Sequence, residues 1–100
     1  MVNKDFIKQL QQNFDTGLEL IRSKNLDYGS EVDPFKNFRM AQLVGVSVER
    51  AILVRVSDKL ARISNLLDKE AAVKDETIDD TLIDSINYLN ILLVYLQSKR

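Results

Sequence analysis

The stretch that decides the fold is Asp75 to Arg100, DETIDDTLIDSINYLNILLVYLQSKR, which reads as one long helix with two different halves. In the first half three carboxylates recur at every fourth residue: Glu76, Asp80 and Asp84. At about 100° per residue they share one stripe of the helix surface. The second half is apolar at nearly every angle except the side of Asn87 and Asn90. We therefore expect it to be buried on most sides.

Two apolar surfaces are expected on this helix. The first repeats at helical spacing opposite Glu76 and is predicted to form the core stripe: Ile78, Leu82, Ser85 or Ile86, Leu89, Leu93 and Leu96. Ile91 and Tyr95 continue instead from the edge marked by Asp84 and Tyr88, so a second surface must cover them. In so short a chain we expect that surface to come from another subunit.

Three further helices are predicted upstream. The first runs from Asn3, its cap, to about Lys24; a short one starts at Pro34 behind the cap Asp33 and ends at Val44, before Gly45; and the third runs from the cap Ser47 to about Asp68. Apolar residues at helical spacing mark the two long ones: Phe6, Ile7, Leu10, Phe14, Leu18 and Ile21, then Ile52, Val56, Leu60, Ile63 and Leu67. Residues 25–33 gather turn-forming side chains and are read as a loop.

The predicted fold class is therefore all-α. Short connections between long amphipathic helices favour a small antiparallel helical bundle of three long helices and one short one. A chain of 100 residues with 45% hydrophobic content supports a single domain, residues 1–100, and we expect oligomerisation to complete its burial.

Composition excludes several kinds of chemistry. The chain has no cysteine, which removes disulfides, thiolate nucleophiles and sulfur-ligated zinc, and no histidine, which removes Ser-His and Cys-His nucleophiles, histidine bases and histidine metal ligands. Any chemistry must use carboxylates, lysines, tyrosines or a hard cation held by oxygen. With a formal net charge of −1 and interspersed acids and bases, the sequence predicts no basic surface that would bind duplex nucleic acid. No apolar run is long enough to span a membrane. We expect a cytoplasmic protein.

Two charged stripes are candidate sites. The first stripe consists of the acids of the last helix, including Asp79, together with Asp58 of the helix before it. Their oxygen atoms suit Mg²⁺ or Mn²⁺. Acids at the start of a helix also complement the helix dipole, which is the alternative explanation. Arg55, Lys59 and Arg62 fall on one side of the preceding helix. They suit an anionic ligand, but spacing alone favours an interhelical salt-bridge network on a solvated face.

Two further sets of polar residues each allow a functional and a structural role. The loop brings together Lys24, Asn25, Asp27 and Tyr28, which suit contacts to a base and a phosphate but also suit a turn. Phe35 and Phe38, a little further on, are expected in the core. Asn87 and Asn90 either fix helix register or a subunit contact, or Asn87 extends the acidic stripe toward a ligand.

Four blocks in order carry a family resemblance: Lys24-Asn25-Leu26-Asp27-Tyr28-Gly29, Asn37-Phe38, Asp58-Lys59-Leu60-Ala61-Arg62-Ile63, and Glu76 to Tyr88. From about Lys24 to Tyr95 the chain resembles the phage and bacterial nucleotide modification associated domain 1 family, which is similar to the MazG-like all-alpha nucleoside triphosphate pyrophosphohydrolases. The resemblance implies a homodimeric or homotetrameric bundle that cleaves a (deoxy)nucleoside triphosphate to the monophosphate and pyrophosphate with magnesium.

The resemblance also implies roles for residues. Four acids would hold the metal, with the first three also catalytic: Asp58, Glu76, Asp80 and Asp84. Substrate would be contacted by eight residues: Lys24, Asn25, Asp27, Tyr28, Arg55, Lys59, Arg62 and Asn87. The departure is at Asp58 and Arg62, which stand where MazG-like enzymes have paired glutamates. Two alternatives follow: a module that binds nucleotides without cutting them, and a helical adaptor for another protein.

Overall fold

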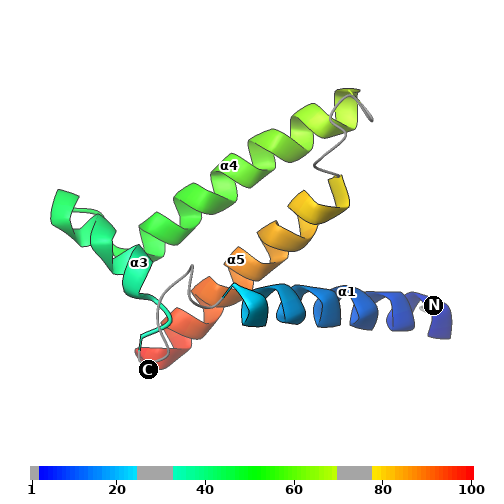
Figure 1. Ribbon diagram of the computed structural model, residues 1–100, viewed down its shortest axis with the longest axis horizontal. Coiled ribbons are helices and arrows are strands. Elements are labelled where there is room, and N and C mark those ends of the chain that lie inside the picture. The colour runs from blue at the N-terminus through cyan, green and yellow to red at the C-terminus, as the bar shows by residue number, and fades with distance from the viewer. Residues whose placement is uncertain (1–2, 25–32, 70–77) are drawn as a thin grey trace.

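The computed structural model describes residues 3–24, 33–69 and 78–100, and every regular element there is helical (Figure 1). In chain order the elements are α1 (Lys4–Ser23), α3 (Lys36–Arg39), the 3₁₀ helix η1 (Met40–Val44), α4 (Val48–Lys69) and α5 (Ile78–Ser98). The predicted all-α class is confirmed. The expected loop between the first two helices, up to residue 32, and residues 75–77 at the expected start of the last helix lie outside the described residues.

The helix boundaries follow the capping residues that the sequence offers. The Asn3 side-chain oxygen accepts a hydrogen bond from the Phe6 N–H at 2.7 Å, and the Ser47 hydroxyl accepts one from the Arg50 N–H at 3.2 Å. Gly45 ends η1 with φ +78°, a left-handed conformation that a side chain disfavours. The predicted caps at Asn3, Ser47 and Gly45 are confirmed.

The short helix begins later than predicted. It begins at Lys36 rather than Pro34, because the Asp33 carboxylate accepts from the Phe35 N–H at 3.0 Å and the Asp33 carbonyl from the Lys36 N–H at 3.2 Å, which closes a turn first. From Met40 the helix tightens into the 3₁₀ form, as helix ends often do.

The centre of the molecule is the antiparallel pair of α4 and α5, which run side by side in Figure 1. A small core lies where α3 meets this pair, and its buried members are Phe35, Phe38, Val48, Ile52 and Tyr95. The Phe35 and Tyr95 rings pack edge to face with centroids 5.1 Å apart. Phe35 and Phe38 are therefore core residues, as expected.

The two apolar surfaces of α5 are covered differently from the prediction. Tyr95, expected to need another subunit, is buried within the chain against Phe35. Four members of the predicted core stripe are 40–49% exposed: Leu82, Ile86, Leu89 and Leu93. Ser85, the predicted alternative to Ile86, is buried as expected, together with Thr81. Small side chains at these two positions let α4 approach closely, and the Ser85 hydroxyl donates to the Thr81 carbonyl at 2.9 Å.

The other predicted stripes are also partly wrong. On α4, Ile52 and Val56 are buried as expected, but Leu60 and Leu67 are 58% and 65% exposed. On α1, Gly17 is the one buried residue among those described, and five members of its predicted core stripe are exposed: Phe6, Ile7, Leu10, Phe14 and Leu18. The described chain therefore covers only part of the apolar surface that its sequence carries.

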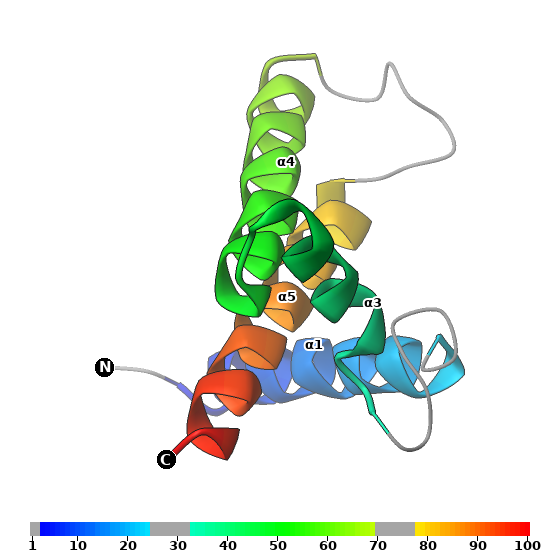
Figure 2. The ribbon, with the colours of Figure 1, turned by 90° about the vertical axis from the view of Figure 1, so that its left-hand side faces the viewer.

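Helix α1 crosses α5 rather than running along it, as both views show (Figures 1 and 2). At the crossing the Asn87 amide donates to the Gly17 carbonyl at 3.1 Å, and a Cβ at residue 17 would lie 2.6 Å from the Asn87 oxygen. Any side chain at residue 17 would displace the Asn87 amide, so the close approach of the two helices favours glycine here.

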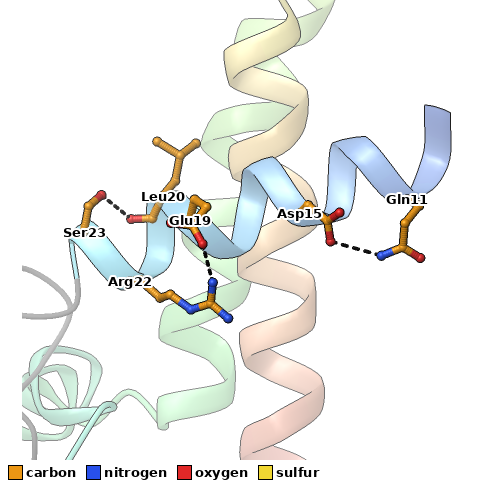
Figure 3. Close-up of polar contacts among 6 residues, drawn as sticks. All are labelled: Gln11, Asp15, Glu19, Leu20, Arg22 and Ser23. Carbon is orange, nitrogen blue, oxygen red and sulfur yellow. Dashed lines mark hydrogen bonds and ion pairs between the residues drawn. The ribbon is translucent and has the colours of Figure 1, made fainter. Parts of the chain in front are cut away.

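The opposite side of α1 is polar and holds its own contacts (Figure 3). Gln11 donates to Asp15 at 3.0 Å, Arg22 pairs with Glu19, and the Ser23 hydroxyl donates to a backbone carbonyl one turn back. This side therefore faces solvent, and the apolar side is the one that lacks cover. Among the described residues, no helix combines the length and the apolar character that crossing a bilayer requires.

Candidate functional site

A cleft of about 350 Å³ opens on one side of the α4–α5 pair. Four elements contribute to it: the C-terminal end of α1, α3, α4 and α5. The residues that line it are Lys24, Asn37, Phe38, Arg55, Lys59, Asp84 and Tyr88. Residues from distant parts of the sequence therefore meet at one surface depression.

Among the described residues positive charge dominates the lining of this cleft, because Lys24, Arg55 and Lys59 stand against the carboxylate of Asp84. Arg55 and Lys59 are one turn apart on α4 and so project to the same side. Lys24 caps the C-terminus of α1, where its N–H donates to the Leu20 carbonyl at 3.0 Å. Three cations from two helices, α1 and α4, favour an anionic ligand.

One ion pair joins the two long helices across the cleft. The Lys59 amine lies 3.2 Å from the Asp84 carboxylate, and both side chains are about four-fifths buried, with 20% and 24% exposed. Water screens a half-enclosed pair of this kind less than a surface pair. The contact fixes both side chains and neutralises Asp84, the acid that the described residues place in the lining.

The remaining wall of the cleft is aromatic. Phe38 and Tyr88 meet edge to face, with ring centroids 6.3 Å apart and planes at 83°. Phe38 is buried, so it holds the Tyr88 ring in place from the core side, and the Asn37 amide lies beside them. A fixed ring and an amide next to cations offer a flat apolar surface and hydrogen bonds to the uncharged part of an anionic ligand.

The residues predicted for the site fall into three groups. Four of them line the cleft: Lys24, Arg55, Lys59 and Asp84. Four lie outside the described residues: Asn25, Asp27, Tyr28 and Glu76. Four others are described but do not line it: Asp58, Arg62, Asp80 and Asn87.

Arg62 and Asp80 are exposed and lie one turn beyond the lining, toward the C-terminal end of α4 and the N-terminal end of α5. They extend the basic and acidic walls past the cleft. Asn87 is buried on another side of α5, where it bonds Gly17. Of the two roles open to Asn87, the geometry supports the helix–helix contact.

The acidic side chains of α4 and α5 are the described residues that could hold a divalent cation. Within the described residues no three acidic side chains come together as a metal-binding group. Asp80 and Asp84 stand one turn apart on α5, and Mg²⁺ usually takes only one or two protein carboxylates with water and substrate phosphate. These two residues offer oxygen donors of the kind that Mg²⁺ or Mn²⁺ takes, and the Asp84 carboxylate is already paired with Lys59. Asp58 lies on the exposed surface of α4.

Three cleft residues were not assigned to the site from the sequence: Asn37, Phe38 and Tyr88. A signal for them existed, because Asn37-Phe38 forms one of the four blocks of the family resemblance and Tyr88 ends another. The helical spacing of Asp84 and Tyr88 also placed both on one edge of α5.

Comparison of the chain with protein-family models, with curated proteins and with solved structures finds no match. The resemblance to the nucleotide modification associated domain 1 family and to MazG-like enzymes therefore stays a prediction.

Proposed function

We propose that this protein binds a (deoxy)nucleoside triphosphate in the α4–α5 cleft and, with Mg²⁺, cleaves it to the monophosphate and pyrophosphate. The observation that carries the proposal is the meeting of Lys24, Arg55 and Lys59 with Tyr88 in one depression. Cations and an aromatic ring side by side match the two chemically different ends of a nucleotide.

The dimensions and the charge of the cleft support this ligand class. Its volume of about 350 Å³ is within the range of small-ligand pockets, which is roughly 300–1,000 Å³. The guanidinium of Arg55 and the amines of Lys24 and Lys59 would bind phosphate oxygens by charge-assisted hydrogen bonds. The base would lie against Tyr88, with Asn37 in reach of its polar edge.

Asp80 and Asp84 of α5, together with Glu76, would hold the magnesium ion. When bound, such an ion polarises the phosphoryl oxygens and lowers the pKa of an attacking water. Because the chain has no histidine, the proposal assigns the general base to a carboxylate. The basic residues of α4 would stabilise the negative charge that grows on the departing pyrophosphate.

A second candidate function is nucleotide binding without hydrolysis. The observation that favours it is the Lys59–Asp84 contact at 3.2 Å. Because this pair already neutralises the acid in the lining, Lys24 and Arg55 are left to attract phosphate without help from a metal. This module would bind nucleotides in the presence of a chelator and would release no pyrophosphate.

One experiment separates these outcomes. The protein is titrated with a panel of ribo- and deoxyribonucleoside triphosphates, with Mg²⁺ or with a chelator, while thermal shift and pyrophosphate release are both followed. Release from at least one triphosphate with Mg²⁺ supports the hydrolase, and a thermal shift without release selects the binding module. If no nucleotide shifts the melting temperature in either buffer, both functions are wrong.

A matched pair of variants ties binding to the cleft. Arg55→Gln removes one charge from the lining, whereas Arg50→Gln removes the same charge from an exposed position on the same helix, outside the lining. A charge-assisted hydrogen bond is worth about 1.5–3 kcal/mol, so we expect Arg55→Gln to raise Kd by roughly tenfold or more. Equal weakening by both variants would show that binding is non-specific.

We also propose that the chain works as a homo-oligomer, a homodimer or a homotetramer. Support comes from the exposed apolar side chains of α1, α4 and α5. They form continuous stripes, whereas the exposed apolar residues of a monomer are usually scattered singly over its surface.

A further inference from the structure

The exposed leucines of α4 and α5 gather on one face of the helix pair. We infer that this face, the side of the α4–α5 pair opposite the cleft, docks onto the same face of a second copy of the chain. The inference deepens the self-association proposed above by naming the surface, and it does not depend on the ligand in the cleft.

The stripe on α5 has the spacing of a helix–helix seam. Its exposed members, Leu82, Ile86, Leu89 and Leu93, are separated by four, three and four residues. Alternating steps of three and four define the heptad pattern through which helices pack along their length. Neither α1 nor α4 covers these side chains, since each remains 40–49% exposed.

A second stripe follows α4, where Leu53, Leu60 and Leu67 recur at every seventh residue and are 47–65% exposed. Seven residues are nearly two full turns, so the three side chains share one side of the helix. The two stripes together, seven side chains in all, are called the leucine face below.

Helix geometry places both stripes on the same side of the pair. At about 100° per residue, Leu60 and Arg55 lie on opposite flanks of the side of α4 that buries Ile52 and Val56. On α5, Leu89 and Asp84 likewise flank the buried side of Thr81 and Ser85.

Because the two helices are antiparallel, these flanks match: Asp84 meets Lys59, beside Arg55, at the cleft, and the leucines fall together on the other side.

The leucine face is suited to contact its own copy. Leu60 stands midway between Leu53 and Leu67 on the α4 stripe, and the α5 stripe runs beside it on the same side of the pair. A two-fold axis brings the same patch of both chains together, so every contact between two residues of the face is made twice.

The exposed area also matches what a stable dimer buries. Taking about 150 Å² for a fully exposed leucine, the leucine face leaves on the order of 500 Å² of apolar surface open. A standard interface buries about 800 Å² per partner, of which about 65% is apolar in homodimers, or roughly 520 Å². One further copy is therefore enough to cover the face.

This arrangement has a consequence for the cleft. Each cleft is built from a single chain and opens on the outside of the dimer, away from its partner. Ligand binding and dimer formation are then independent, which separates the interface from the site in a test.

The test uses variants of the leucine face and a control outside it. Leu60→Glu and Leu89→Glu place a charge in the face, whereas Leu43→Glu changes an η1 side chain that is 78% exposed and lies elsewhere. Sedimentation should show a dimer for the wild type and for Leu43→Glu. For both face variants we expect the dimer Kd to rise at least about 100-fold, with helicity by circular dichroism checking that they fold.

Cysteine cross-linking keeps the proposal testable if the glutamate variants unfold. The chain contains no cysteine, so Leu60→Cys introduces a single thiol in the leucine face, midway along the α4 stripe, and Leu43→Cys a single thiol outside the face. Under mild oxidation the former should give a covalent dimer at micromolar concentration and the latter should not.

A wild type that stays monomeric at every concentration would overturn both the proposed self-association and the face, and would favour a different protein as the occupant. A dimer that survives both glutamate substitutions, with no cross-link at residue 60, would overturn the face and leave self-association standing. Loss of nucleotide binding in a folded Leu60→Glu monomer would contradict the separation of cleft and interface.

Discussion

The α1–α5 crossing offers a sharp test of the packing, because two residues there depend on each other. Gly17→Ala adds a methyl group 2.6 Å from the Asn87 amide oxygen, so the amide must move and its hydrogen bond to the Gly17 carbonyl is lost. An unsatisfied buried amide costs about 1–3 kcal/mol. Alanine is favoured over glycine in a helix by about 1 kcal/mol. The net change is a destabilisation of roughly 0–2 kcal/mol.

The same substitution should have the opposite sign when Asn87 is already alanine. In that background the methyl group meets no amide, and only the gain of about 1 kcal/mol in helix propensity remains. The double-mutant cycle should therefore show a coupling of about 2 kcal/mol between the two positions. Thr16→Ala, at an exposed neighbouring position, is the control and should be additive with Asn87→Ala.

Urea unfolding followed by circular dichroism measures the four free energies of unfolding. All proteins must be compared at one concentration, since self-association adds to apparent stability. If Gly17→Ala stabilises both backgrounds equally, the two helices do not approach as described, and the positioning of α1 is wrong.

Three further predictions concern the core, a cap and pH. Phe35→Ala removes the ring that packs on Tyr95 at 5.1 Å and should cost about 3–5 kcal/mol in urea unfolding, enough to abolish the transition of so small a core. Ser47→Ala removes the cap of α4 and should cost about 1 kcal/mol, whereas a loss near zero would exclude the cap. The hydrogen bond from Arg39 at 2.7 Å lowers the pKa of Asp33, so this carboxylate stabilises the fold above its unfolded pKa and the contribution disappears as the pH falls through its folded pKa. Between about pH 5 and pH 3 the wild type should therefore lose more stability than Asp33→Asn, and parallel pH profiles would contradict this.

Helical periodicity predicted the elements well, because caps and spacing are local properties. Asn3, Ser47 and Gly45 bound their helices as expected. Periodicity did not predict which apolar surface is covered within the chain. Leu89 and Ser85 lie near each other on the wheel of α5, and only the close approach of α4 decides that the serine is buried.

The cleft was predictable in part for the same reason. Arg55 and Lys59 share a side of α4, and the Lys59–Asp84 pair is an interhelical salt bridge of the kind expected for this basic stripe. The aromatic wall was not predictable from spacing. It depends on where the turn at Asp33 places Phe38 against Tyr88, and this is a tertiary contact.

The crossing at Gly17 also bears on how firmly the N-terminal segment is held. In the described part of the chain α1 packs on no helix other than α5, and an isolated helix of 20 residues is only marginally stable in water. Its first turns should therefore exchange their amide hydrogens faster than those of α4 and α5. Any assembly that covers Phe6, Leu10 and Phe14 should slow that exchange, which makes the first turns of α1 a reporter of a covered apolar side.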